Sequence, residues 1–188
     1  GAEPRPLRVL ILEDRPADAE LMELELRRAG LKLDWTRVDS EKDFLASLSE
    51  DLDIILSDYS MPQFDALQAL SLLQDTGLDI PFIVVTGSFE ARAIECMKRG
   101  AADYLIKDRL GRLAPAVSQA IQERMLRREK RGIEQALRES EARFRSVAES
   151  AVDGLVLVDD RGEIGYWNPA AEQIFGYREE EMLGQRLA

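Results

Sequence analysis

The chain has 188 residues, of which 45% are hydrophobic and 32% are charged, and its formal net charge at pH 7 is −11. This length suits one domain of ordinary size plus a further segment, and the hydrophobic share is enough for a buried core. The acidic balance argues against a nucleic-acid-binding protein and against an anionic membrane surface as partner, because both need a basic face.

Two residue types narrow the chemistry further. Histidine is absent, and cysteine occurs once, as Cys96. The chain therefore has no histidine metal site, no Ser–His triad, no phosphoaccepting histidine and no internal disulfide. We expect a buried, structural Cys96 and a reducing, cytoplasmic location. We expect neither a secretory signal nor a membrane helix, since no apolar run reaches the ~20 residues of a membrane span.

The first region alternates short apolar runs with helical patterns. Strands are expected at 8–12, 33–38, 53–57, 82–85 and 104–106. A helix should begin at Pro16 and end at Gly30, and a second should have Ser40 as its N-cap. Further helices are expected around 67–73, from about Glu90 to Arg99, and from near Leu113. This alternation predicts a doubly wound parallel sheet.

A charged helical segment follows, over residues 115–150. From Leu126 onwards, eight positions are separated by alternating steps of four and three residues, the last of them just past the segment: 126, 130, 133, 137, 140, 144, 147 and 151. They form a heptad seam with two polar interruptions, Lys130 and Ser140, so the pattern favours a parallel coiled-coil dimer. The alternative is a single amphipathic helix that lies on its own domain.

The last region, residues 151–188, reads as a small α+β segment. An apolar strand at 155–158, a turn at 159–162 and a partner strand at 163–167 form the expected hairpin. Asn168 should cap a helix that has Pro169 in its first turn and ends at Gly176, and a short helix should follow at 178–183. Two strands and two short helices are too few to enclose a core.

Polar and charged side chains follow four of the five expected strands of the first region. They are Glu13 and Asp14 after the first strand, Asp58 after the third, Thr86 after the fourth and Lys107 after the fifth. Ligands of open parallel sheets gather at the carboxyl ends of the strands, so all five side chains should meet at one edge. Each has an ordinary interpretation alone, as a turn residue, a helix cap or a solvated charge, but the joint pattern favours a site for phosphoryl transfer.

The chemistry assigns a role to each of these residues. Mg²⁺ prefers oxygen ligands, and the carboxylates supply them. Asp58 is the best candidate nucleophile, Lys107 is a fixed cation that can offset phosphoryl charge, and Thr86 offers a hydroxyl to a phosphoryl oxygen.

These residues lie in stretches that resemble the receiver domain of two-component response regulators. The resemblance extends over about residues 8–120 and rests on 9–14, 57–62, 84–87 and 100–107, which read VLILED, SDYSMP, VVTG and GAADYLIK. It implies that Asp58 accepts a phosphoryl group from the phosphohistidine of a histidine kinase or phosphotransfer protein. Glu13, Asp14, Asp58 and the Ser60 backbone carbonyl would bind Mg²⁺.

The same resemblance implies two further roles. Lys107 would pair with the phosphoryl group, and Thr86 and Tyr104 would form a switch pair in which the hydroxyl moves inward and the ring follows. The sequence departs from the family pattern at Asp108, where proline is common, so we expect no cis peptide bond there. It departs again at Asp65-Ala66, which replaces a frequent Asp-Gly.

Residues from about 140 to 188 resemble the beginning of a sensory PAS domain. The matching pieces read SEARFR at 140–145, AVDGL at 151–155, WNPAA at 167–171 and FGY at 175–177. The expected architecture is thus a flavodoxin-like five-stranded parallel sheet in the order 2-1-3-4-5, then a long helix or coiled coil, then a partial PAS segment. The expected boundaries are 1–114 for the receiver, with its last helix continuing to about 124, then 115–150 and 151–188.

The expected function is phosphoryl-dependent signalling with Mg²⁺ as cofactor, relayed through a dimeric helical linker to the PAS or output region. No separate catalytic domain is expected in this chain. Two alternatives remain: a phosphorylation-independent dimerisation scaffold, and a phosphatase with Asp58 as nucleophile. The phosphatase needs a second acid two residues after the nucleophile, and that position is Ser60.

Overall fold

The computed structural model of the protein describes residues 5–87 and 91–186. It contains two compact units, Gly1–Arg128 and Glu129–Ala188, which are described one at a time. The long helix α5 (Leu113–Ser150) belongs to both.

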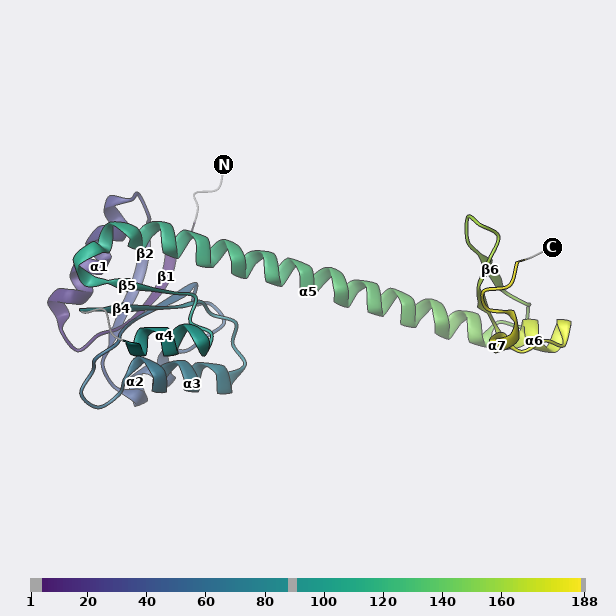
Figure 1. Ribbon diagram of the computed structural model, residues 1–188, viewed down its shortest axis with the longest axis horizontal. Coiled ribbons are helices and arrows are strands. Elements are labelled where there is room, and N and C mark those ends of the chain that lie inside the picture. The colour runs from purple at the N-terminus through teal and green to yellow at the C-terminus, as the bar shows by residue number, and fades with distance from the viewer. Residues whose placement is uncertain (1–4, 88–90, 187–188) are drawn as a thin grey trace. The chain divides into compact units, whose positions relative to one another are not determined.

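The first unit is built on a parallel sheet in the strand order β2-β1-β3-β4-β5, which confirms the predicted fold (Figure 1). Its strands are β1 (Leu7–Leu12), β2 (Leu33–Val38), β3 (Ile54–Asp58), β4 (Phe82–Thr86) and β5 (Asp103–Ile106). The helices are α1 (Pro16–Arg28), α2 (Glu41–Ser47), α3 (Ala66–Thr76), α4 (Ala91–Lys98), the 3-10 helix η1 (Lys107–Arg112) and the first part of α5.

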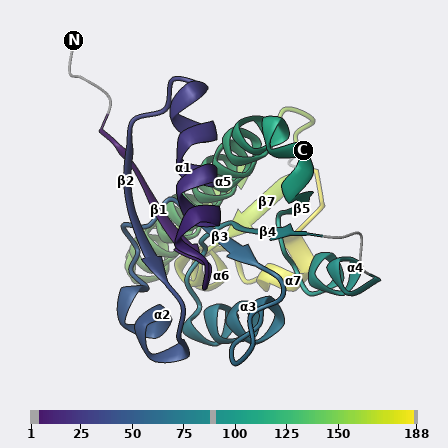
Figure 2. The same ribbon diagram turned by 90° about the vertical axis from the view of Figure 1, so that its left-hand side faces the viewer.

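Helices cover the sheet on both faces, and each face has its own core (Figure 2). One core joins α1 and α5 to alternate strand residues, including Val9, Ile11 and Leu56. The other joins α2, α3 and α4 to the intervening residues, such as Leu10 and Ile55. Burial on both faces explains why the inner strands read as continuous apolar runs and lack alternation.

Local sequence signals set several helix ends. The Ser40 side chain accepts the backbone N–H of Asp43, as predicted for the N-cap of α2. Asp65 and Gln68 form a capping box at the start of α3, and Gly77 ends that helix in the left-handed region, with φ 72°. The substitution of Ala66 for glycine therefore leaves the start of α3 well capped.

The predicted strand boundaries were wrong by one residue at several ends. Strand β3 begins at Ile54 and includes Asp58, and β4 includes Thr86, because hydrogen bonding to the neighbouring strand continues beyond the apolar run. Helix α1 ends at Arg28, two residues before Gly30. The predicted start of α4 at Glu90 lies outside the described residues. The described residues contain no cis peptide bond.

Buried Cys96 lies in the core between α3, α4 and the sheet, which confirms the expected burial of its side chain. Burial also raises the pKa of the Cys96 thiol above its usual value.

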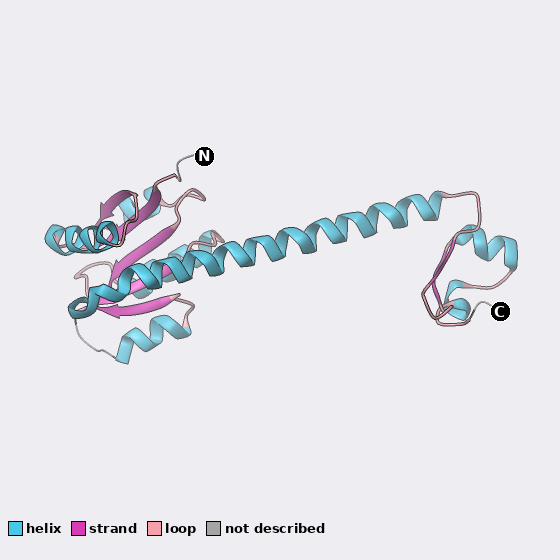
Figure 3. Cartoon of the chain, turned by 90° about the horizontal axis from the view of Figure 1, so that it is seen from above, coloured by secondary structure: helices cyan, strands magenta, loops and turns pink. Residues whose placement is uncertain are grey.

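Helix α5 runs unbroken from Leu113 to Ser150 (Figure 3). Its first turns bury Leu113, Ala116, Val117 and Ala120, a helical spacing that places one face against the sheet. The last receiver helix and the expected linker are thus one continuous element.

The second unit adds a small antiparallel hairpin and two short helices to the end of α5. Its elements are β6 (Val156–Val158), β7 (Ile164–Trp167), α6 (Pro169–Phe175) and α7 (Glu179–Met182). As predicted, Asn168 caps α6, and Gly176 ends it in the left-handed region. The core of this unit is small, with Ile164, Trp167 and Ala171 at its centre.

Candidate phosphoryl-transfer site

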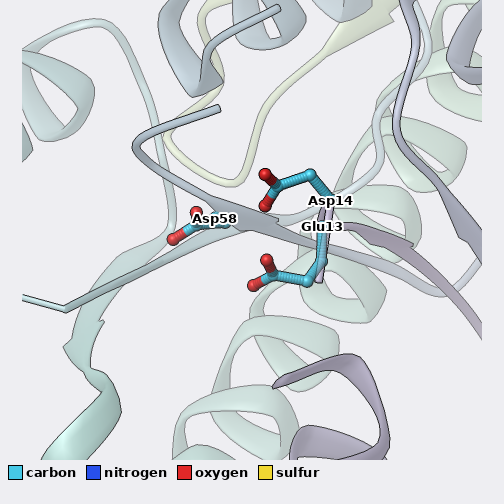
Figure 4. A group of neighbouring side chains, drawn as sticks. All are labelled: Glu13, Asp14 and Asp58. Atoms are coloured by element: carbon cyan, nitrogen blue, oxygen red, sulfur yellow. The ribbon is translucent and has the colours of Figure 1, made fainter. Parts of the chain in front are cut away.

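Three carboxylates converge at the carboxyl edge of the first unit's sheet. Glu13 and Asp14 follow the last residue of β1, and Asp58 is the last residue of β3. Since Leu12 pairs with Ser57 in the ladder, continuing the register by one residue sets Glu13 beside Asp58. One oxygen from each of the three side chains lies within 4.8 Å of the others (Figure 4).

The backbone around Glu13 is held firmly. Its N–H donates to the Val38 carbonyl at 3.0 Å, and its own carbonyl accepts a hydrogen bond from Arg37 at 2.8 Å. The Glu13 carboxylate accepts the Arg15 backbone N–H through Oε1, at 3.1 Å. The first of the acids is thereby fixed in direction.

Lys107 reaches the carboxylates from the end of β5, an edge strand of the sheet. It follows β5 directly, and its Nζ lies 2.8 Å from Glu13 Oε2 and 3.2 Å from Asp58 Oδ1. Burial opposes the charged form of Lys107, but hydrogen bonds to Asp18 and Glu13 and the charge of Asp58 outweigh burial, so the pKa of Lys107 is raised. The residue is therefore a permanent cation at neutral pH.

The carboxylates differ in their surroundings. Glu13 is fully buried, and burial raises its pKa to about 6. Burial likewise raises the pKa of Asp58, although Lys107 opposes that change. Asp14 is exposed. The cluster thus combines two desolvated acids with one that faces solvent.

Thr86 and Tyr104 lie on β4 and β5, the two strands that follow β3 in the sheet order. Val85 pairs with Asp58, which places buried Thr86 one residue beyond, at the end of β4. Half-buried Tyr104, on β5, pairs with Val84 of β4 and packs against the core under α3 and α4. Because side chains alternate along a strand, Thr86 and Tyr104 belong to the same face of the sheet as Val84.

Ser60 lies in the exposed loop two residues after Asp58. Its backbone carbonyl stays a predicted metal ligand.

Asp18 was missed in the sequence analysis. It lies in the first turn of α1, and its Oδ2 is 2.7 Å from Lys107 Nζ, the shortest of the contacts that Lys107 makes with an acid. The available signal was its position. A helix that begins two residues after the paired acids keeps its first turn at the same sheet edge.

The donor set fits a magnesium ion. Carboxylate oxygens are the ligands that Mg²⁺ prefers, and an ionised carboxylate can accept hydrogen bonds and still coordinate a cation. The two buried acids and the solvent-facing Asp14 leave room for the water ligands that Mg²⁺ retains.

Family models match both parts of the chain. Residues 9–118 match the response regulator receiver domain, and residues 142–188 match the PAS fold. The chain therefore belongs to the response regulator receiver domain family and continues into a PAS-fold segment whose match begins near the end of the long helix. Both are signalling domains.

Individual relatives agree with this assignment. The cell cycle transcriptional regulator CtrA of Caulobacter vibrioides is 30% identical over 102 residues, which are 54% of this chain and 44% of CtrA. The response regulator protein FleR of Pseudomonas aeruginosa is 35% identical over 103 residues, which are 53% of this chain and 21% of FleR. The chain thus spans less than half the length of these relatives.

Solved structures show the same fold. A response regulator structure from Chloroflexus aurantiacus is 26% identical, with a TM-score of 0.56, and the match covers 63% of this chain and 99% of that one. None of the helices in the described part of the chain combines the length and the hydrophobicity that crossing a bilayer requires.

Proposed function

We propose that this chain is a phosphoacceptor module of a two-component system, in which Asp58 receives the phosphoryl group. The observation that carries this proposal is the placement of Asp58: it ends β3 beside Glu13 and Asp14 and lies 3.2 Å from the Lys107 ammonium. A carboxylate at the open edge of a sheet, next to a fixed cation, is suited to attack on an anionic phosphorus.

In the proposed reaction, an Asp58 carboxylate oxygen attacks the phosphorus of a phosphohistidine on a histidine kinase or a phosphotransfer protein. The new O–P bond forms an acyl phosphate as the N–P bond breaks, and the imidazole leaves with the bonding electron pair and takes up a proton. Lys107 offsets negative charge on the phosphoryl oxygens because it lies beside Asp58 and stays protonated.

Glu13, Asp14, Asp58 and the Ser60 carbonyl would hold Mg²⁺. When bound, the ion supplies positive charge that reduces the repulsion between Asp58 and the incoming phosphoryl group. The mutual approach of the three carboxylates, whose repulsion a divalent cation would relieve, supports this assignment.

The phosphoryl state would then be passed on through the other face of the sheet. Thr86 follows the partner of Asp58 on β4, and Tyr104 lies on the next strand, so a shift of the Thr86 hydroxyl towards a phosphoryl oxygen would make room for the ring. Such a change shifts a two-state equilibrium that the bound phosphoryl group biases. Continuous α5 would relay it towards the PAS segment, in a cytoplasmic protein.

We further propose that two copies pair through α5. Five apolar seam residues are between 45% and 66% exposed, which are Leu126, Ile133, Leu137, Phe144 and Val147. Together with the polar positions Lys130 and Ser140, they follow the alternating four- and three-residue spacing of a parallel coiled-coil seam.

The experiment that tests phosphorylation is intact-mass measurement after incubation with acetyl phosphate and Mg²⁺. We expect one added phosphoryl group in the wild type, and none in Asp58→Asn or in the presence of EDTA. Asp75→Asn, a change at an exposed acid on α3, is the matched control and should be modified like the wild type. Undiminished phosphorylation of Asp58→Asn, or none in the wild type, would overturn the proposal.

A further inference from the structure

Lys107 has an acidic neighbour beyond those proposed to bind metal or phosphoryl. A lysine ammonium has three N–H donors, and the Lys107 Nζ lies within 3.2 Å of carboxylate oxygens from Asp18, Glu13 and Asp58. The contact with Asp18, at 2.7 Å, is the shortest.

Asp18 stands apart from the carboxylate cluster. The cluster consists of Glu13, Asp14 and Asp58, whereas Asp18 approaches Lys107 from the first turn of α1. The hydrogen bond from Lys107 lowers the pKa of Asp18, and a helix N-terminus also favours a negative charge at this position. Asp18 is thus ionised at neutral pH, where Lys107 is also charged.

We propose that Asp18 is a positioning residue that holds the Lys107 ammonium and so limits how strongly Lys107 binds the phosphoryl group on Asp58. This inference rests on the proposed function. Phosphorylation converts the Asp58 carboxylate into an acyl phosphate, and the phosphoryl oxygens then need the Lys107 charge. Asp18 continues to compete for the Lys107 ammonium, because its position on α1 does not depend on whether Asp58 is phosphorylated.

The consequence is a limit on the affinity of the site for a phosphoryl group. Removing the negative charge of Asp18 leaves one donor of Lys107 without an anionic partner, and the phosphoryl group gains the stronger interaction. The variant Asp18→Asn keeps the size of the side chain, removes its charge and replaces one acceptor oxygen by an NH2 group. A charge-assisted hydrogen bond at a partly exposed site corresponds to about a fivefold change in affinity.

The test is a titration with beryllofluoride, a phosphoryl mimic, at saturating Mg²⁺, followed by fluorine NMR on the full chain. We expect about fivefold tighter binding for Asp18→Asn than for the wild type, and a return towards wild-type affinity for Asp18→Glu. Glu20→Gln, which removes an exposed charge from the same helix, should bind like the wild type and controls for the change in net charge.

The spectrum supplies a readout that a purely structural role would not move. The fluorine resonance that faces Lys107 should shift in Asp18→Asn while the other bound resonances stay in place. Equal or weaker binding by Asp18→Asn, tightening in Glu20→Gln of the same size, or an unshifted spectrum would each overturn the inference.

The proposed function fails in a different way. If the wild type shows no bound fluorine signal above that of Asp58→Asn, the phosphoacceptor assignment itself is wrong. A bound wild-type signal with an Asp18→Asn affinity that does not increase refutes only the role of Asp18.

Discussion

At the scale of single residues, Glu13 is the acid whose burial has the clearest cost. Burial raises the pKa of Glu13 to about 6, from an ordinary value of 4.5. The folded state therefore binds more protons than the unfolded state between pH 4.5 and 6. The free energy of unfolding contributed by this group falls as the pH rises through that window.

We predict a pH-dependent gap in stability between the wild type and Glu13→Gln, measured by urea unfolding in EDTA. Relative to the variant, the wild type should lose about 2 kcal/mol between pH 4.5 and pH 7, since one pKa unit corresponds to about 1.4 kcal/mol. Added Mg²⁺ should restore the wild type at pH 7 and leave Glu13→Gln nearly unchanged. A gap that is the same at both pH values would contradict the prediction.

The residues that meet at the sheet edge were predictable to an unequal degree. Glu13, Asp14, Asp58 and Lys107 follow strands, and the carboxyl ends of parallel strands must meet. Asp18 lies on a helix, and its approach to Lys107 depends on how α1 is rotated against the sheet, which the apolar residues Ala19, Met22 and Leu26 decide through packing.

At the scale of elements, hydrogen bonds from one arginine connect α5 to the segment just before β3, the strand that ends in Asp58. Arg124 is buried, and its guanidinium donates to the backbone carbonyls of Glu50, Leu52 and Asp53, just before β3. Burial lowers the pKa of Arg124, so this contact has a desolvation cost that the carbonyls must offset.

We predict that Arg124→Met lowers the free energy of unfolding of the first unit by about 1–3 kcal/mol, because three partly buried hydrogen bonds to backbone carbonyls are lost. Urea unfolding of the full chain measures this loss, and hydrogen exchange in residues 54–58 assigns it to the first unit. Arg128→Met, at an exposed arginine one turn further along α5, is the control and should stay within about 0.5 kcal/mol of the wild type. Equal effects of the two changes would contradict the stabilising role of the Arg124 hydrogen bonds.

The second unit depends on a buried asparagine. The Asn168 Oδ1 accepts the N–H groups of Leu155 and Ala171, and its Nδ2 donates to the carbonyls of Ala148 and Asp153. One fully buried side chain therefore joins the end of α5, the hairpin and α6. The sequence predicted the cap of α6, but the bonds to Ala148 and Asp153 depend on a tertiary approach that spacing does not show.

We predict that Asn168→Ala destabilises the second unit by about 3 kcal/mol, since it leaves several buried groups unpaired. Asn168→Asp should be destabilising as well, because it keeps the two acceptor bonds but turns a carboxylate towards two carbonyls. Hydrogen exchange should quicken in residues 155–171 for both variants and stay unchanged in residues 54–58. Wild-type protection of 155–171 in Asn168→Asp would show that only the acceptor bonds matter.

At the scale of the whole molecule, the exposed seam of α5 is the surface on which the proposed dimer depends. In the turns of α5 that follow Arg124, the apolar side chains of the seam are mostly exposed among the residues that the structure describes. The heptad spacing was readable from the sequence, whereas the pairing of two helices stays a prediction, which the exposure of Leu126, Ile133 and Leu137 supports.

We predict that Leu137→Glu weakens self-association at least about tenfold, because an unpaired carboxylate in an apolar seam costs more than 1.4 kcal/mol. Sedimentation equilibrium of the full chain measures the dissociation constant. Gln135→Glu adds the same charge away from the seam and should leave association intact. A monomeric wild type would remove the dimer from the account.

The buried thiol of Cys96 is a natural probe of local opening in the receiver. Core burial shields the sulfur, and the raised pKa keeps it protonated, so a thiol reagent must wait until the layer beneath α4 opens. Since the chain has no second cysteine, the rate of alkylation reports the frequency of that one opening event without any engineered label. A ligand that makes this opening rarer or more frequent should therefore slow or speed the alkylation of the Cys96 sulfur.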